Sequence, residues 1–153
     1  MFRLHRVVVL TSLLAAELPA EQPGFKMQVV GGTVGSLHSG CSARLDLSEA
    51  ESLVLHCGKT EMTIPWGKVN TLEYGQNVSR RYAVAILISP VLLLSKSRKH
   101  FVTLGYVDTE GKQQALVVRV EKGDIRSVLV GLEARTGRRV EYQDSEARKA
   151  GKG

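Results

Sequence analysis

The fold is decided by residues 41–64, CSARLDLSEAESLVLHCGKTEMTI, in which apolar side chains recur at every second position. This period of two is typical of a β-strand that buries one face. The polar stretch 48–51 interrupts the alternation once, and Gly58 with Lys59 interrupts it a second time. A two-residue loop with glycine first is a usual connection in a tight hairpin. The pattern therefore predicts three antiparallel strands in a meander.

The register of this meander determines whether its two cysteines meet. Pairing Leu45 with Leu53 buries both apolar rows and places Cys41 opposite Cys57, while the second hairpin pairs Leu53 with Ile64. A slip of two residues would bury the same faces. The sequence thus leaves two alternatives open, a Cys41–Cys57 disulfide or two free thiols in the core.

Further strands are predicted on both sides of the meander. A first strand at 25–30 is followed by a glycine-rich joint at 31–36, and the alternation resumes at 70–76, 100–108 and 113–121. The fold class expected from this pattern is mostly β, with six to seven antiparallel strands.

The period changes near the C-terminus. Asp124 is a good N-cap and Gly137 a good left-handed stop, and between them a helix is predicted with one apolar stripe, formed by Ile125, Val128, Leu129 and Leu132. One such stripe indicates a helix that packs on the sheet, which makes the class α+β. The charged segment 140–153 is expected to be a frayed tail.

The N-terminus has the composition of a signal peptide. Arg3 and Arg6 precede the apolar run 7–16, and a small residue, Ala20, marks a cleavage point. The alternative is an N-terminal core helix. The expected organisation is a signal peptide at 1–20, a flexible segment with the first strand at 21–40, one domain at 41–139 and the tail at 140–153. A signal peptide implies export to the periplasm or the outer face of the cell envelope.

A charge-free apolar run, YAVAILISPVLLLS at 82–95, lies between basic clusters. Its fourteen residues would span about 21 Å as a helix, too short for a hydrocarbon core of about 30 Å. Ser89-Pro90 favours a broken helix or helical hairpin instead. The run either lies as such an element on a membrane or partner surface, or is a strand or core helix buried in the protein's own core or in a dimer interface.

On the first alternative, the basic residues meet an anionic membrane and the apolar ones enter it. The contact residues would be Arg80, Arg81, Ile86, Leu87, Leu92, Leu93, Lys96, Arg98 and Lys99. On the second alternative the protein is a protein-binding or structural envelope domain that uses an exposed strand edge.

Several phrases resemble known bacterial domains. The stretch IPWGKVNTLEY at 64–74 is similar to the turn before the fourth strand of PH-like and GRAM-like domains. The phrases LEYGQ (72–76), LSKSRKHF (94–101) and LEARTG (132–137) resemble a group of exported bacterial proteins with no assigned function. The resemblance covers about 41–139 and implies a PH-like barrel or sandwich capped by one helix, together with export, but no activity.

Other chemistry is weakly supported. His38, Cys41, His56 and Cys57 include metal-ligating types, but consecutive strand residues point to opposite faces, so His56 and Cys57 cannot converge on one ion. No motif assembles a catalytic group, and we expect a non-enzymatic protein with no metal and no cofactor. The formal charge is +6, yet only 5% of residues are aromatic, which argues against nucleic acid as the partner.

Overall fold

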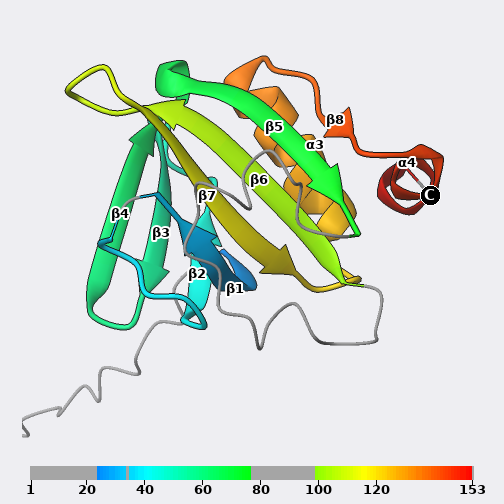
Figure 1. Cartoon of the computed structure of the whole chain (residues 1–153), viewed down its shortest axis with the longest axis horizontal. Coiled ribbons are helices and arrows are strands. Elements are labelled where there is room, and N and C mark those ends of the chain that lie inside the picture. Colours follow the sequence, from blue (N-terminus) through cyan, green and yellow to red (C-terminus); the bar gives the residue numbers. More distant parts are fainter. Residues whose placement is uncertain (1–23, 34, 77–98, 153) are drawn as a thin grey trace, which may run out of the picture.

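The computed structural model describes residues 24–33, 35–76 and 99–152, which form one eight-stranded sheet and two α-helices (Figure 1). The elements are, in chain order, β1 (Phe25–Gly32), β2 (Ser42–Asp46), β3 (Ser52–Cys57), β4 (Thr60–Pro65), the 3-10 helix η1 (Trp66–Lys68), β5 (Val69–Gly75), β6 (His100–Val107), β7 (Gln113–Val120), α3 (Ile125–Thr136), β8 (Glu141–Tyr142) and α4 (Ser145–Lys152). The prediction of a mostly β, α+β protein is confirmed.

The sheet has the strand order β4-β3-β2-β1-β7-β6-β5-β8 and is not closed into a barrel. Two meanders, β1–β4 and β5–β7, are joined through β1, because it pairs with β2 on one side and with β7 on the other. All pairings are antiparallel except β5 with β8, which run parallel. A bulge between Val29 and Gly31 interrupts the pairing of β1 with β7, and bulges bend and twist the strand that carries them.

Helix α3 lies against one face of the sheet, where it contacts β5 and η1 (Figure 1). It ends at Gly137, whose φ of 67° lets its N–H donate to Glu133 O at 2.9 Å. The apolar stripe predicted from the sequence is buried in full and joins the core (Ile125, Val128, Leu129, Leu132). Asp124 occupies the N-cap as predicted, but its side chain makes no capping hydrogen bond.

The second hairpin has the predicted register, with Leu53 opposite Ile64 and a positive φ at Gly58. The first hairpin does not. Leu45 pairs with Leu55 instead of Leu53, a slip of two residues that keeps the same faces buried.

Trp66 contacts the loop of the first hairpin, whose register differs from the prediction. The alternation of apolar residues does not predict these contacts. The Trp66 indole N–H donates to Glu49 O at 3.1 Å, and its backbone N–H donates to Glu51 O at 3.0 Å. These bonds tie η1 to the loop between β2 and β3. Trp66 itself is buried in the core.

The C-terminal segment is folded, so the prediction of a frayed tail is wrong. β8 pairs with β5, and the Gln143 backbone N–H donates to Tyr74 O at 3.1 Å. The Gln143 amide also donates to a carboxylate oxygen of the buried Glu73 at 3.0 Å. The Asp144 carboxylate accepts the Ala147 N–H at 2.7 Å and so caps α4. The fold therefore extends beyond the expected 41–139 at both ends.

Leu132 tests how much stability the α3 stripe provides. Its side chain is fully buried, and we expect Leu132→Ala to lower the free energy of unfolding by about 2–5 kcal/mol. Val130 lies on the same helix with 60% of its surface exposed, so Val130→Ala should change that free energy by less than about 0.5 kcal/mol. Urea denaturation of both variants measures the difference, and equal effects would contradict the packing of α3 described above.

Candidate functional site

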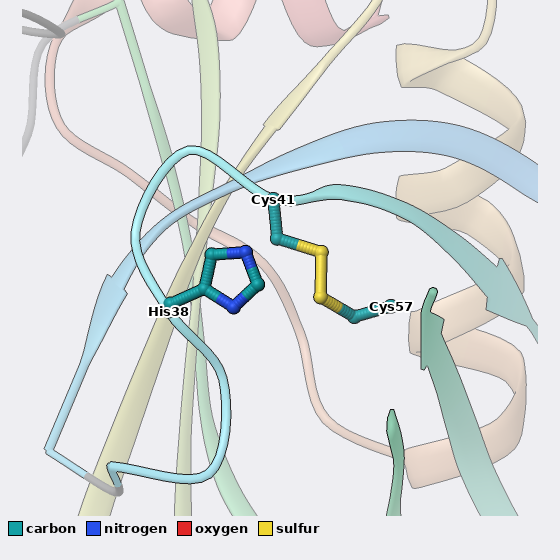
Figure 2. A group of neighbouring side chains, drawn as sticks. All are labelled: His38, Cys41 and Cys57. Carbon is teal, nitrogen blue, oxygen red and sulfur yellow. A yellow bond between two sulfur atoms is a disulfide. The ribbon is translucent and has the colours of Figure 1, made fainter. Parts of the chain in front are cut away.

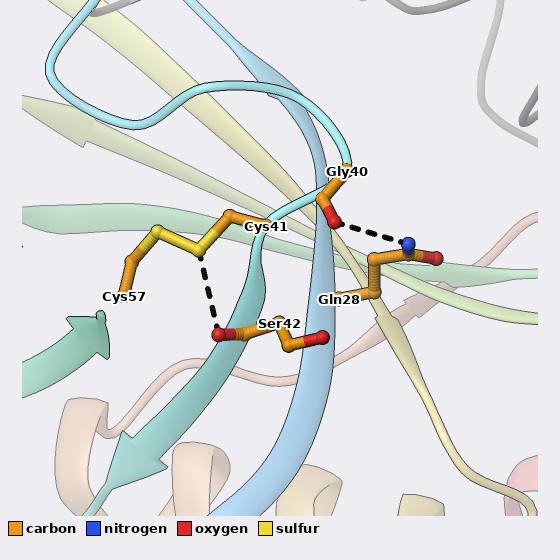
Figure 3. Close-up of a disulfide and its surroundings, with 5 residues drawn as sticks. All are labelled: Gln28, Gly40, Cys41, Ser42 and Cys57. Carbon is orange, nitrogen blue, oxygen red and sulfur yellow. Dashed lines mark hydrogen bonds between the residues drawn. A yellow bond between two sulfur atoms is a disulfide. The ribbon is translucent and has the colours of Figure 1, made fainter.

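The structure joins Cys41 and Cys57 by a disulfide whose Cα atoms are 6.2 Å apart (Figure 3). Because Cys57 pairs with Ala43, the two cysteines are diagonal neighbours instead of directly opposite residues. The loop before Cys41 is anchored by Gln28, whose amide donates to Gly40 O at 3.2 Å. The sulfur of Cys41 also lies 3.4 Å from Ser42 O, and since a disulfide sulfur carries no hydrogen, this is a packing contact.

His38 lies beside the disulfide (Figure 2). One ring nitrogen of His38 and the two sulfur atoms all lie within 4.8 Å of one another. Both cysteines are buried, whereas His38 is exposed. His56 takes no part, because its imidazole is 3.4 Å from the Glu61 carboxylate. Alternation along the strand separates His56 from Cys57, but no local sequence pattern indicates that His38 approaches the sulfur pair.

A strongly basic hollow lies between the end of α3 and α4. It has a volume of about 600 Å³ and is lined by Glu133, Gly137, Arg138, Arg139, Val140, Tyr142, Arg148 and Lys152. We call this surface the basic hollow. It exists because β8 and α4 fold back onto β5, which brings the cations of the 138–139 turn and of α4 to one place.

The charges of the basic hollow are poorly balanced by the protein itself. Its one acidic residue, Glu133, accepts the Val140 backbone N–H at 2.7 Å. The ion pairs found within the described ranges, His56–Glu61 and Lys112–Glu110, involve none of its four cations. The Lys152 ammonium lies 5.7 Å from the centre of the Tyr142 ring, within reach of a cation–π interaction. The hollow thus offers guanidinium and ammonium groups to an anion.

Aromatic packing supports the hollow from beneath. The Tyr142 ring meets Tyr74 edge to face at a centroid distance of 5.9 Å. The buried Tyr74 hydroxyl and His100 Nδ1 are hydrogen-bonded at 2.6 Å. Burial, followed by the charge of Glu133, raises the pKa of Tyr142. Tyr142 is therefore a neutral platform, held in place by the core.

A second hollow of about 460 Å³ lies over β1, β2 and β3. Its lining includes Lys26, Arg44, Arg119 and Glu121. Lys26 and Arg44 are paired directly across the strands, but neither is without a partner. Two of its cations are therefore already engaged within the protein.

Of the residues expected to touch a membrane, Lys99 belongs to the described part of the chain, where it is half-buried just before β6. The others lie outside the described residues (Arg80, Arg81, Ile86, Leu87, Leu92, Leu93, Lys96, Arg98), and their role stays a prediction. Among the described helices, none has the length and apolar character needed to cross a membrane.

The basic hollow was missed because two of its four cations, Arg148 and Lys152, were assigned to a frayed tail. One local signal was present: Asp144 in front of Ser145-Glu146-Ala147 is a helix start. Nothing in the spacing, however, indicated that α4 would pack beside the end of α3.

No family model matches the sequence, and no curated protein matches it.

His100 gives the fold a specific dependence on pH. Burial, with a smaller contribution from the charge of Lys122, lowers the pKa of His100 below 6.5. The unfolded chain therefore binds a proton at a pH at which the folded chain does not. The stability contributed by the neutral imidazole is present above pH 6.5 and is lost as the pH falls through the folded-state pKa.

Glutamine does not titrate and retains a hydrogen-bonding group for Tyr74. We therefore expect His100→Gln to remove the part of the acid-induced decrease in the free energy of unfolding that His100 causes. Urea midpoints measured from about pH 7 down to about pH 5 give the comparison. The pKa values of the Asp46 and Asp108 carboxyl groups are lowered from the usual 3.8. These groups therefore take up protons only below the pH range of this comparison. The same decline in both proteins would show that His100 is not its source.

Proposed function

We propose that the protein is an exported, non-enzymatic binding module that docks on a phosphate-bearing anionic membrane surface through the basic hollow. The observation that carries the proposal is the gathering of Arg138, Arg139, Arg148 and Lys152 around one concave surface. Guanidinium groups suit this task because they bind phosphate oxygens in pairs.

The expected strength is that of a reversible contact. Each Lys or Arg near an anionic leaflet strengthens binding by about five-fold, so four of them together give several hundred-fold over a neutral surface. Tyr142 at the base of the hollow adds an aromatic ring with a polar tip, a residue type suited to the membrane interface. An apolar segment entering the same membrane would increase the affinity further.

The proposal also includes a PH-like architecture and an oxidising compartment outside the cytoplasm. Two meanders, β1–β4 and β5–β7, followed by a helix, support assignment to a PH-like architecture, a scaffold used for binding. The Cys41–Cys57 disulfide supports an oxidising compartment, as expected of an exported protein. The rival function is a protein-binding envelope domain, favoured by β4, an edge strand with exposed Thr60, Glu61 and Thr63.

Flotation with liposomes tests the membrane proposal. We expect the mature chain to float with vesicles that contain an anionic phospholipid, to release at high salt, and to ignore neutral vesicles. Arg138→Glu with Arg139→Glu should reduce the bound fraction as expected for an affinity loss of at least about 20-fold.

The control is Lys59→Glu with Arg126→Glu, which makes the same change in net charge on exposed residues outside the hollow. Equal losses in the two double variants would mean that overall charge, and not the basic hollow, attracts the protein. Leu87→Asp in the same assay tests the separate prediction that the apolar segment enters the membrane. If the unaltered chain ignores anionic vesicles, the membrane proposal fails and the protein-binding function takes its place.

A further inference from the structure

We propose that Cys41, Cys57 and His38 form a zinc site when the disulfide is reduced. This inference is independent of the basic hollow. The three residues present two sulfur atoms and one imidazole nitrogen within 4.8 Å of one another (Figure 2). Ligands of one tetrahedral zinc ion are about 3.5–3.8 Å apart, given Zn–S bonds of about 2.3 Å and Zn–N bonds of about 2.0–2.1 Å. Opening the disulfide and a small shift of the ring suffice to reach that spacing.

The loop that carries His38 is held by bonds that do not need the disulfide. The Cys41 N–H donates to His38 O at 3.3 Å, which closes a turn around Gly40, whose φ is 89°. The Gly40 N–H donates to Val29 O at 2.8 Å, and the Ser39 hydroxyl donates to Val30 O at 2.6 Å. These bonds to β1 keep His38 and Cys41 on the same side after reduction.

Cys57 approaches from β3, where its place is fixed on both sides. It pairs with Ala43 on β2 and with Thr60 on β4. Two ligands therefore come from one turn and the third comes from a central strand of the meander. All three ligands belong to the described part of the chain.

The ligand set selects the kind of metal. Two thiolates and one imidazole favour a soft or borderline ion such as Zn²⁺ over Mg²⁺ or Ca²⁺. Cys41 and Cys57 are 7% and 3% exposed, whereas His38 is exposed, so the fourth position of the metal opens to solvent on the His38 side. Water or a group from a partner would complete the tetrahedron there.

Zinc binding requires that a dithiol first reduces the disulfide. A dithiol gives two electrons and two protons to the Cys41–Cys57 disulfide, and the dithiol itself becomes a disulfide. Zn²⁺ then displaces one proton from each of the two thiols, and these protons pass to water. In the oxidised state each sulfur is bonded to the other, so no thiolate exists and the zinc site is closed.

Cobalt titration of the full chain tests the site. The protein is reduced with a water-soluble phosphine, which becomes the phosphine oxide as water supplies the oxygen, and Co²⁺ is then added. We expect one Co²⁺ per chain, with the thiolate charge-transfer and tetrahedral d–d bands that Zn²⁺ then abolishes by displacement. The oxidised protein should show neither band.

His38→Ala identifies the third ligand. It should weaken zinc binding by more than the roughly 10–100-fold that the loss of a second-shell partner costs. The matched control is His56→Ala, which removes the imidazole next to Cys57 that pairs with Glu61 and should leave zinc affinity unchanged. Equal zinc affinity in His38→Ala and the unaltered chain would overturn the proposal, as would equal affinity in the reduced chain and a Cys41→Ser, Cys57→Ser double variant.

Thermal unfolding covers the case in which the reduced chain loses its fold. Zinc that binds the folded state raises Tm, so the same Zn²⁺ concentration should raise the Tm of the reduced unaltered chain and of His56→Ala by similar amounts, and that of His38→Ala by clearly less. A reduced chain that remains unfolded in saturating Zn²⁺ would also refute the site.

Discussion

The pairing of β1 with β7 is the constraint on which the rest of the structure depends. It joins residues as distant in sequence as Met27 and Val120 and converts two separate meanders into one sheet. The bulge after Val29 bends β1 at the junction, and α3, which follows β7 directly, then covers the core on the face that the two halves share. Loss of this pairing would leave two small sheets with their apolar faces in water.

The basic hollow is a second consequence of long-range packing. Parallel pairing of β8 with β5 gives the chain after α3 a partner, and Tyr74 then connects Tyr142 to the buried His100. Cations that repel one another are held close because the apolar and aromatic contacts beneath them, including the fully buried Ala147 of α4, compensate for the repulsion. A surface with four cations and one carboxylate, maintained by a buried core, is well placed to receive an anion.

The cysteine pair shows what a period of two can and cannot specify. The period of two predicts that both cysteines lie on the buried face of the meander. This prediction holds in either register, since a slip of two residues leaves the buried face unchanged. The period did not determine that Cys57 would face Ala43, nor that the loop after β1 would bring His38 to the sulfur atoms. The observed register of β2 with β3 occurs together with the hydrogen bonds between Trp66 and the 47–51 loop. These bonds connect residues that are distant in sequence and that no local pattern relates.

The sequence by itself determined the strands of both meanders, the tight turn at Gly58, and the helix from Asp124 to Gly137 with its buried stripe. These features depend on local conformational preference and on the period of the apolar residues, and both can be read from residues that are close in sequence. Only the tertiary structure decided the register of the first hairpin, the place of the C-terminal segment and the composition of the two candidate sites. Each of these depends on contacts between elements far apart in sequence. The stabilising free energy of such contacts comes from tertiary packing and cannot be derived from the residues of one segment alone.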